Sequence, residues 1–122
     1  MAYVDGFVIV VPTRKLPAYW KLARASSKIW LELGASEYRE CAGDDLNIPF
    51  GVPFPKLAKA KPGETVVFSW IVYKNKATRD RVNARVMKDP RILAMCDPKN
   101  MPFDMKRMSM GGFKVVVSAL KA

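Results

Sequence analysis

Two stretches of the chain are apolar on both sides of an extended backbone, and they predict the central strands of a sheet. The first runs from Tyr3 to Val11 and ends at Pro12, and the second runs from Thr65 to Tyr73. β-Branched and aromatic residues dominate both stretches, as is typical of strands. Because neither stretch alternates with polar residues, we expect each strand to be covered on both faces.

Apolar residues that recur every three or four positions predict a helix from about Arg14 to Leu33. Thr13 is placed to cap its first turn, and Gly34 is placed to end it. The residues expected on its buried side are Leu16, Trp20, Ala23, Ser27 and Trp30. We interpret the two tryptophans as core residues, because their spacing is that of a packed helix face.

A second helix is predicted from Lys76 to about Lys88, with Asn75 as its cap. Val82 and Val86 form its inner stripe. The pair Asp89-Pro90 ends this helix, because the residue before a proline is pushed out of the helical region.

The remaining segments are more polar or irregular. Ala35 to Gly43 predicts an edge strand, Ser109 to Leu120 predicts the last strand, and Arg91 to Met95 predicts a single turn of helix. Residues 44–63 and 97–108 are predicted to be irregular excursions. The first of them is rich in proline but contains enough apolar residues to pack on the domain. It suits a functional flap, a partner-binding arm or a variable insertion, and the sequence leaves these three open.

Together the elements give the order β-α-β-β-α-β within one domain, residues 1–122, which is the ferredoxin-like α+β fold. This fold has a four-stranded antiparallel sheet with two helices on one face. The opposite face is expected to be solvated, yet both central strands are apolar there. A second copy of the chain would cover that face, so we predict a homodimer.

The chain carries 21 Lys and Arg against 11 Asp and Glu, a net charge of +10. A charge of this size attracts polyanions, so a basic module that binds RNA or another polyanion is an alternative function. The basic stripe for that purpose would be Lys74, Arg81, Arg85 and Lys88. Nucleic acid is not the favoured partner, because acidic residues interrupt the stripe and the strands lack the aromatic motif of RNA-recognition folds.

The sequence contains no histidine. This excludes Ser-His-Asp and Cys-His catalysis and any metal or haem held by a histidine of this chain, and we expect neither a metal nor a cofactor. The two cysteines, Cys41 and Cys96, are far apart in sequence and are expected to be reduced. No apolar run reaches the roughly 18 residues of a membrane span, and no signal peptide is recognisable. We therefore expect a cytoplasmic protein without a membrane partner.

Two groups of polar residues in regular elements are candidates for a site. Asp5 is a carboxylate in an otherwise apolar strand, so it is paired with a local arginine, exposed at the strand start, or functional as an acid or base. Arg79, Asp80 and Asn83 lie on the second helix. Arg79 and Asn83 share a face and can present donors to an anion or a carbonyl, although a polar helix surface gives the same pattern.

A third group, Asp104, Lys106 and Arg107, precedes the last strand. Charged residues beside special backbone often mark a binding loop, but the same loop can fasten the domain through Asp5 or the other protomer. Five of the seven methionines lie between Met95 and Met110. Their flexible side chains suit an apolar small-molecule pocket and equally a loosely packed interface.

Several blocks of sequence resemble one family. They are Tyr3-Val4-Asp5-Gly6-Phe7-Val8, Val67-Phe68-Ser69-Trp70, Arg79-Asp80 with Asn83, Asp89-Pro90-Arg91, and a long block from Met101 to Phe113. Together they are similar to the YbaA-like bacterial family of unknown function, over nearly the whole chain and least across residues 44–63.

The resemblance implies a dimeric α/β barrel, in which two sheets pack face to face, and it adds Trp70 to the candidate pocket residues. Relatives on this fold include monooxygenases and isomerases, so an enzyme here would resemble a cofactor-independent monooxygenase or isomerase. One fold hosts many chemistries, so the resemblance assigns no reaction. The function predicted is a homodimer that binds or transforms a small apolar organic molecule.

Overall fold

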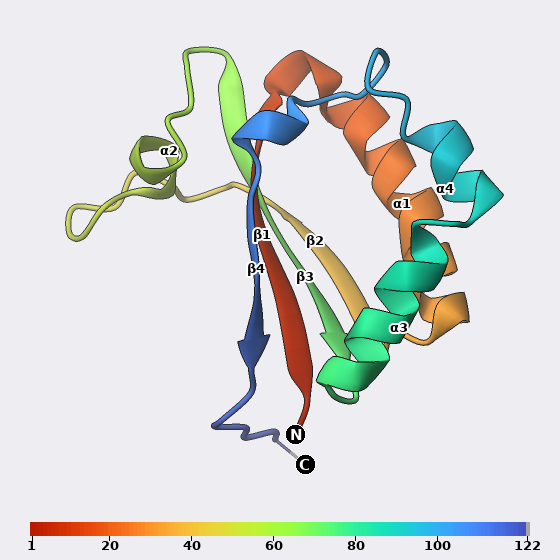
Figure 1. Ribbon diagram of the computed structural model, residues 1–122. Coiled ribbons are helices and arrows are strands. Elements are labelled where there is room, and N and C mark those ends of the chain that lie inside the picture. The colour runs from red at the N-terminus through yellow and green to blue at the C-terminus, as the bar shows by residue number, and fades with distance from the viewer. Residues whose placement is uncertain (122) are drawn as a thin grey trace.

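A four-stranded antiparallel sheet forms the centre of the computed structural model, which describes residues 1–121. The strands β1 (Tyr3–Pro12), β2 (Glu37–Ala42), β3 (Glu64–Tyr73) and β4 (Ser109–Lys114) have the spatial order β2-β3-β1-β4. Helices α1 (Leu16–Leu33), α3 (Lys76–Val86) and α4 (Pro90–Met95) lie on one side of the sheet, and the single turn α2 (Phe54–Leu57) lies on the other (Figure 1). The ferredoxin-like α+β arrangement predicted from the sequence is confirmed. None of the helices within residues 1–121 is both long and apolar enough to cross a membrane.

The strand register decides which side chains of β1 face the helices. Asp5 lies opposite Ile71 of β3 and Gly112 of β4, so these three positions share a face. Because side chains alternate along a strand, the helix side of β1 carries Tyr3, Asp5, Phe7, Ile9 and Val11. The opposite side carries Val4, Gly6, Val8 and Val10.

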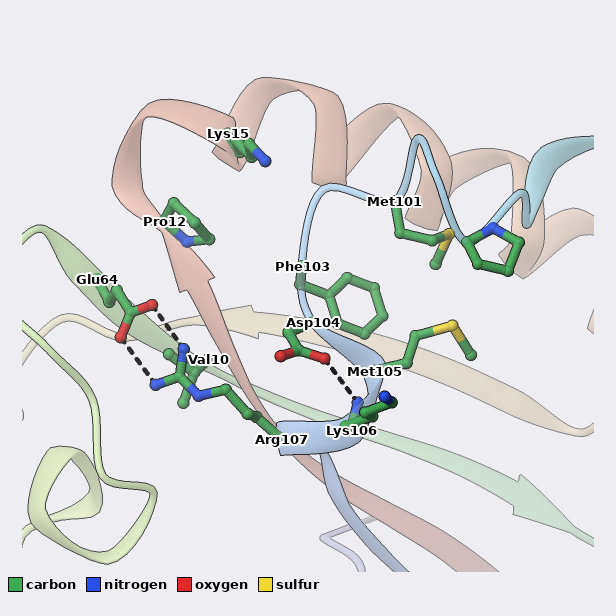
Figure 2. Close-up of a pocket in the computed structure, with 11 residues that line it drawn as sticks. Val10, Pro12, Lys15, Glu64, Met101, Phe103, Asp104, Met105, Lys106 and Arg107 are labelled. Atoms are coloured by element: carbon green, nitrogen blue, oxygen red, sulfur yellow. Dashed lines mark hydrogen bonds and ion pairs between the residues drawn. The ribbon is translucent and has the colours of Figure 1, made fainter.

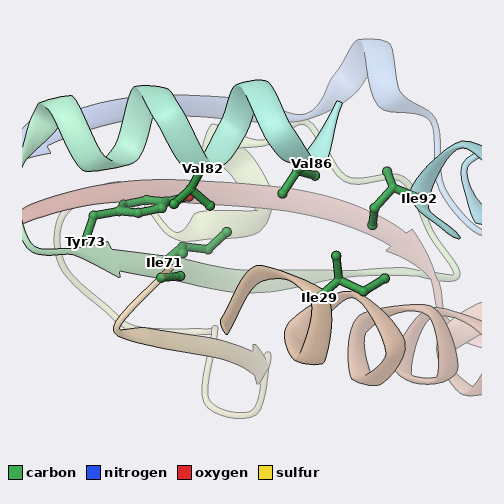
Figure 3. Packing of buried hydrophobic residues seen from close by; sticks show 7 residues of the cluster. Ile29, Ile71, Tyr73, Val82, Val86 and Ile92 are labelled. Carbon is green, nitrogen blue, oxygen red and sulfur yellow. The ribbon is translucent and has the colours of Figure 1, made fainter. Parts of the chain in front are cut away.

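Two clusters of buried side chains fill the space between the sheet and the helices. The first joins α1, β3, α3 and α4 and includes Ile29, Ile71, Tyr73, Val82, Val86 and Ile92 (Figure 3). The second surrounds the end of β1 and contains Ile9, Val11, Tyr19, Ala23 and Val67. Burying a valine side chain contributes about 1.5–3 kcal/mol, so Val82 and Val86 alone fix α3 firmly against β3.

Helix α1 packs on a different face from the one its large residues predict. Its buried residues are Tyr19, Ala23, Ser26 and Ile29, so the predicted stripe is correct only at Ala23. The two tryptophans are half-buried at the edge of the contact. The face that is buried contains small residues, which bring the helix close to the sheet, and a tyrosine whose hydroxyl finds a partner there.

The first turn of this helix also differs from the prediction. A 3-10 turn (Thr13–Lys15) precedes α1, and Lys15 occupies the cap position without a side-chain hydrogen bond. The backbone N–H of Thr13 donates instead to the carbonyl of Gly63, which ties the chain to the start of β3. Gly34 ends α1 as predicted, with the positive φ of 127° that glycine tolerates.

The second helix follows its sequence signals closely. The side chain of Asn75 accepts a hydrogen bond from the N–H of Thr78 at 2.8 Å, which confirms the predicted cap. Helix α3 ends at Val86, two residues before the predicted end. Asp89 then caps α4 by accepting from the N–H of Arg91.

Two segments differ from their predicted structure. Residues 44–63 include α2, because Pro53 and Pro55 preset the backbone for a helix start there. The last strand ends at Lys114 and not at Leu120. It pairs with β1, and the N–H of Val115 already bonds the carbonyl of Ala2, so β1 offers no further partner.

The sheet face opposite the helices is apolar, as the pattern predicts. It carries Val4, Val8, Phe68, Trp70, Val72 and Phe113. The excursion covers one end of it, where the rings of Phe54 and Phe68 lie 6.0 Å apart. Elsewhere the face is open, and Phe113 is 62% exposed. We call this surface the open sheet face.

Candidate functional site

A cleft of about 450 Å³ opens between the end of β1, the 3-10 turn after it and the segment that leads into β4 (Figure 2). Its apolar lining consists of Val10, Pro12, Pro98, Met101, Phe103 and Met105. Its charged lining consists of Lys15, Glu64, Asp104, Lys106 and Arg107. All three residues of the group predicted before the last strand therefore border this cleft.

Arg107 closes one side of the cleft through a two-pronged ion pair. Its Nη1 and Nη2 donate to the two carboxylate oxygens of Glu64 at 2.7 and 2.9 Å, and Nη2 also donates to the carbonyl of Lys59 at 3.1 Å. The hydrogen bonds from Arg107 lower the pKa of Glu64 to about 2. The same bonds raise the pKa of Arg107. The anchor is thus on β3, and the expected bridge from this loop to Asp5 is not formed.

Asp104 and Lys106 belong to the turn on the other side of Arg107. The carboxylate of Asp104 accepts from the backbone N–H of Lys106 at 3.0 Å and so caps the short 3-10 helix Met105–Arg107. Lys106 is exposed and lines the cleft. Lys15 lines the cleft from the opposite wall, with Phe103 between the two lysines in Figure 2.

Asp5, Arg79 and Asn83 form a separate, buried group under α3. Nη1 of Arg79 donates to Oδ1 of Asp5 at 2.9 Å, and Nδ2 of Asn83 donates to Oδ2 at 3.3 Å. The Asp5 side chain is only 3% exposed. Both oxygens of this buried carboxylate therefore have donors, which is the geometry of a satisfied ion pair.

The partners of this group extend it to the edge of the molecule. Asp80 accepts from Nε of Arg79 at 2.8 Å, so one guanidinium bridges two carboxylates. The guanidinium carbon also lies 4.7 Å from the ring centre of Tyr3, a cation–π distance. The hydroxyl of Tyr73 donates to Oδ1 of Asn83 at 3.1 Å. Desolvation by burial, together with the nearby charge of Asp5, raises the pKa of Tyr73.

Trp70 lies apart from both groups. It points to the open sheet face, where its Nε1 donates to the carboxylate of Glu37 at 2.7 Å and its ring lies 5.6 Å from that of Phe68. The eight candidate residues thus lie in three places: the cleft, the buried group under α3 and the open sheet face.

A cluster that the sequence analysis did not identify lies between α1 and the sheet. The hydroxyls of Tyr19 and Tyr38 donate to the two carboxylate oxygens of Glu40 at 2.7 and 2.9 Å. Burial raises the pKa of Glu40, although both tyrosines oppose the shift. Burial also raises the pKa of Tyr19 and of Tyr38. Tyr38 lies two residues before Glu40, so the alternation of side chains along the strand could have paired them, whereas Tyr19 is 21 residues away and no local signal indicates its contact.

The edge of the Tyr19 ring packs against Phe103, with ring centres 5.6 Å apart, so this cluster lies behind the wall of the cleft. A second, smaller hollow of about 240 Å³ lies on the open sheet face under the excursion. Cys41, Leu46, Phe54, Val66 and Phe68 are among its lining residues. Cys41 and Cys96 are both free, and burial raises the pKa of the Cys96 thiol.

The proposed basic stripe is exposed. Lys74, Arg81, Arg85 and Lys88 all lie on the surface at or near α3. Binding of RNA or another polyanion by these four residues stays a prediction. Within residues 1–121, no three His, Cys, Asp or Glu side chains gather closely enough to hold a metal ion.

Comparisons with known proteins match this chain over nearly its whole length. Residues 2–105 match the family model described as "Protein of unknown function (DUF1428)". The "Uncharacterized protein YbaA" of Escherichia coli strain K12 is 41% identical over 117 residues, which are 96% of this chain and 98% of that protein. The protein of the same name from Shigella flexneri is equally similar.

Two solved structures share the fold. One is "Structure of Rv0793 from Mycobacterium tuberculosis", with a TM-score of 0.59 and 12% identity, covering 98% of this chain and 100% of that one. The other is a dimeric ferredoxin-like protein from an uncultured marine organism, with a TM-score of 0.59, 11% identity and the same coverage. At these identities the likeness extends to the fold alone.

Proposed function

This chain belongs to the family of proteins of unknown function DUF1428, and from its own geometry we propose that it is a homodimer that binds a small, largely apolar organic molecule. The ligand lies in the cleft beside Phe103. The open sheet faces of two protomers pack against each other.

The volume and the lining of the cleft are the observations that support ligand binding there. Its volume of about 450 Å³ falls within the range of about 300–1,000 Å³ that small-molecule sites occupy. Its apolar lining includes Phe103 and two methionines, whose unbranched side chains adapt to the shape of a ligand. A few charged groups at the rim can fix the orientation of a bound molecule.

The ligand site is tested with N-phenylnaphthylamine, a neutral probe that fluoresces in apolar surroundings. The variant M101A/M105A shortens both methionines of the cleft and should weaken binding about tenfold, because each truncation removes about 0.7 kcal/mol or more of apolar contact. The control variant M110A shortens an exposed methionine outside the cleft. It should bind the probe as the unaltered protein does.

Absence of saturable binding by the unaltered protein contradicts the proposal. Equal weakening in M101A/M105A and in M110A also contradicts it, because the probe would then report general surface apolarity.

The homodimer is supported by the open sheet face. Phe68 and Phe113 are 44% and 62% exposed, and Val4, Val8 and Val72 lie between them on the same face. An apolar surface of this kind on a sheet favours association with a complementary surface. A second copy offers the same face by symmetry. One solved structure of similar fold is described as a dimeric ferredoxin-like protein.

The C-terminal segment adds to the apolar surface. Val116, Val117 and Leu120 are between 75% and 93% exposed, and they follow directly from β4 at the edge of the sheet. Exposed β-branched residues beside an unpaired sheet edge favour pairing with another chain.

Sedimentation at micromolar concentration tests the dimer and should give twice the chain mass of 13.7 kDa. The variant F113E places a charge on the open sheet face and should sediment at 13.7 kDa. The control L93E places the same charge on α4, where Leu93 is 63% exposed, and should remain dimeric. A monomeric unaltered protein, or a dimer that tolerates F113E, contradicts the proposed interface.

A further inference from the structure

We propose that the ligand of the cleft is an organic monoanion, with an apolar body against Phe103 and the methionines and an acidic headgroup that binds at the lysines of the cleft lining, Lys15 and Lys106. This inference rests on the proposed small-molecule site and states the chemical class that the site selects.

The charges that line the cleft are not equally available to a ligand. Arg107 and Glu64 form a two-pronged pair at 2.7 and 2.9 Å, so they neutralise each other. The remaining charges are those of Asp104, Lys15 and Lys106. The lining as a whole therefore carries one positive charge in excess, and a single anionic group on the ligand balances it.

The two lysines of the cleft are the cationic groups that can pair with an anionic ligand. Neither Lys15 nor Lys106 takes part in an ion pair among the residues that the structure describes. One oxygen of Asp104 accepts from the backbone N–H of Lys106. Each ammonium group carries three donors and no acceptor. Two of the three charged groups outside the Arg107–Glu64 pair are thus donors, which favours an anion over a cation.

The cleft lining has a charged part and an apolar part, so a ligand that fits it has a charged end and an apolar end. Lys15 is half-buried at the end of the 3-10 turn and lines the cleft. A lysine in such a place covers apolar surface with its methylene stem and keeps its ammonium group in water. Phe103 and Met101 line the cleft between this wall and the turn that carries Lys106 (Figure 2). Charge attraction beside an apolar wall is less screened than in open solvent. The headgroup can be a carboxylate or a sulfonate, since both present acidic oxygens to lysine.

Two matched probes separate the headgroup from the apolar body. Anilinonaphthalene sulfonate and N-phenylnaphthylamine share the same two ring systems, but only the first carries an anionic group. The unaltered protein should bind the anionic probe about tenfold more tightly, the equivalent of about 1.4 kcal/mol from two weak ion pairs. The variant K15M/K106M should remove this preference, so that the two probes bind with similar affinity.

A control variant, K21M/K28M, removes the same charge from exposed positions of α1 outside the cleft lining. It should retain the preference for the anionic probe, and raised salt should reduce the preference in the unaltered protein. Circular dichroism melts of all variants verify that they are folded.

Equal affinity of the two probes for the unaltered protein overturns the inference. So does a preference that survives in K15M/K106M or that disappears equally in K21M/K28M. These outcomes leave the small-molecule site intact, whereas insensitivity of both probes to M101A/M105A removes the site itself.

Discussion

The buried ion pair of Asp5 and Arg79 predicts different losses of stability for the two single substitutions. Each charged side chain keeps different partners and a different exposure to solvent when the other is removed. Without Arg79, the Asp5 carboxylate stays 3% exposed and keeps only the amide of Asn83 at 3.3 Å. Without Asp5, the guanidinium keeps Asp80 at 2.8 Å and its 20% exposure to solvent. The two single substitutions are therefore not equivalent.

The variant R79M should lower the free energy of unfolding by about 3–5 kcal/mol, since it leaves a buried charge without a counter-charge. The variant D5N should lower it by about 1–3 kcal/mol, which is the range for an imperfectly satisfied polar group. For a domain of this length, about 4 °C of melting temperature corresponds to 1 kcal/mol. We therefore expect losses of about 12–20 °C for R79M and about 4–12 °C for D5N.

The double variant D5N/R79M carries the decisive test. It removes the buried charge that R79M leaves behind, so it should regain about 2 kcal/mol relative to R79M. Thermal and urea unfolding followed by circular dichroism measure all four proteins. The matched control R81M changes an exposed arginine of the same helix and should stay within about 0.5 kcal/mol of the unaltered protein. Simple addition of the two single losses in the double variant would refute the reasoning.

Three further predictions concern other contacts. Hydrogen bonds from its arginine partner lower the pKa of Glu64 from 4.5 to about 2, so their stabilising effect is present above pH 4.5 and is lost as the pH falls through about 2. E64Q should make the melting temperature depend less on pH over that acid range, and an unchanged pH dependence would contradict this. Burial raises the pKa of Glu40 above 4.5, so stability should decline as the pH rises past that value, and E40Q should remove this decline in the same melts. A β-carbon at Gly112 would lie 2.5 Å from the hydroxyl of Tyr3, so G112A should destabilise the protein by about 1–3 kcal/mol in urea, whereas G111A, whose nearest contact is 3.8 Å, should not.

The fold was predictable because its signals are local. Runs of β-branched and aromatic residues, the Asn75 cap and the Gly34 stop each determine one element without reference to the rest of the chain. The resemblance to the YbaA-like family is confirmed by the 41% identity to that protein. The prediction for the buried face of α1 was wrong because the spacing of Trp20 and Trp30 was interpreted as that of the core face, whereas Tyr19, Ser26 and Ile29 are buried instead. Large rings are often only partly buried at the edge of a contact.

The sequence identified polar residues that make specific contacts, but it did not show which of them lie together in space. Helical spacing correctly placed Arg79 and Asn83 on one face, and both reach Asp5. Nothing in the sequence indicates that Arg107 pairs with Glu64 or that Tyr19 reaches Glu40, because both contacts connect distant segments. Trp70 was placed with the pocket residues, although strand alternation already assigns it to the face away from the helices.

The strand order also has a consequence for synthesis. β1 is made before β3 and β4, yet it lies between them in the sheet. While the chain is still on the ribosome, β1 can pair with β3, but its other edge stays open until β4 has left the exit tunnel. Contacts between such distant segments form slowly, and an open apolar edge is prone to aggregation in the meantime. Pairing of β4 is therefore the last step in the formation of this sheet, and a nascent chain that stalls before Ser109 would expose one edge of β1.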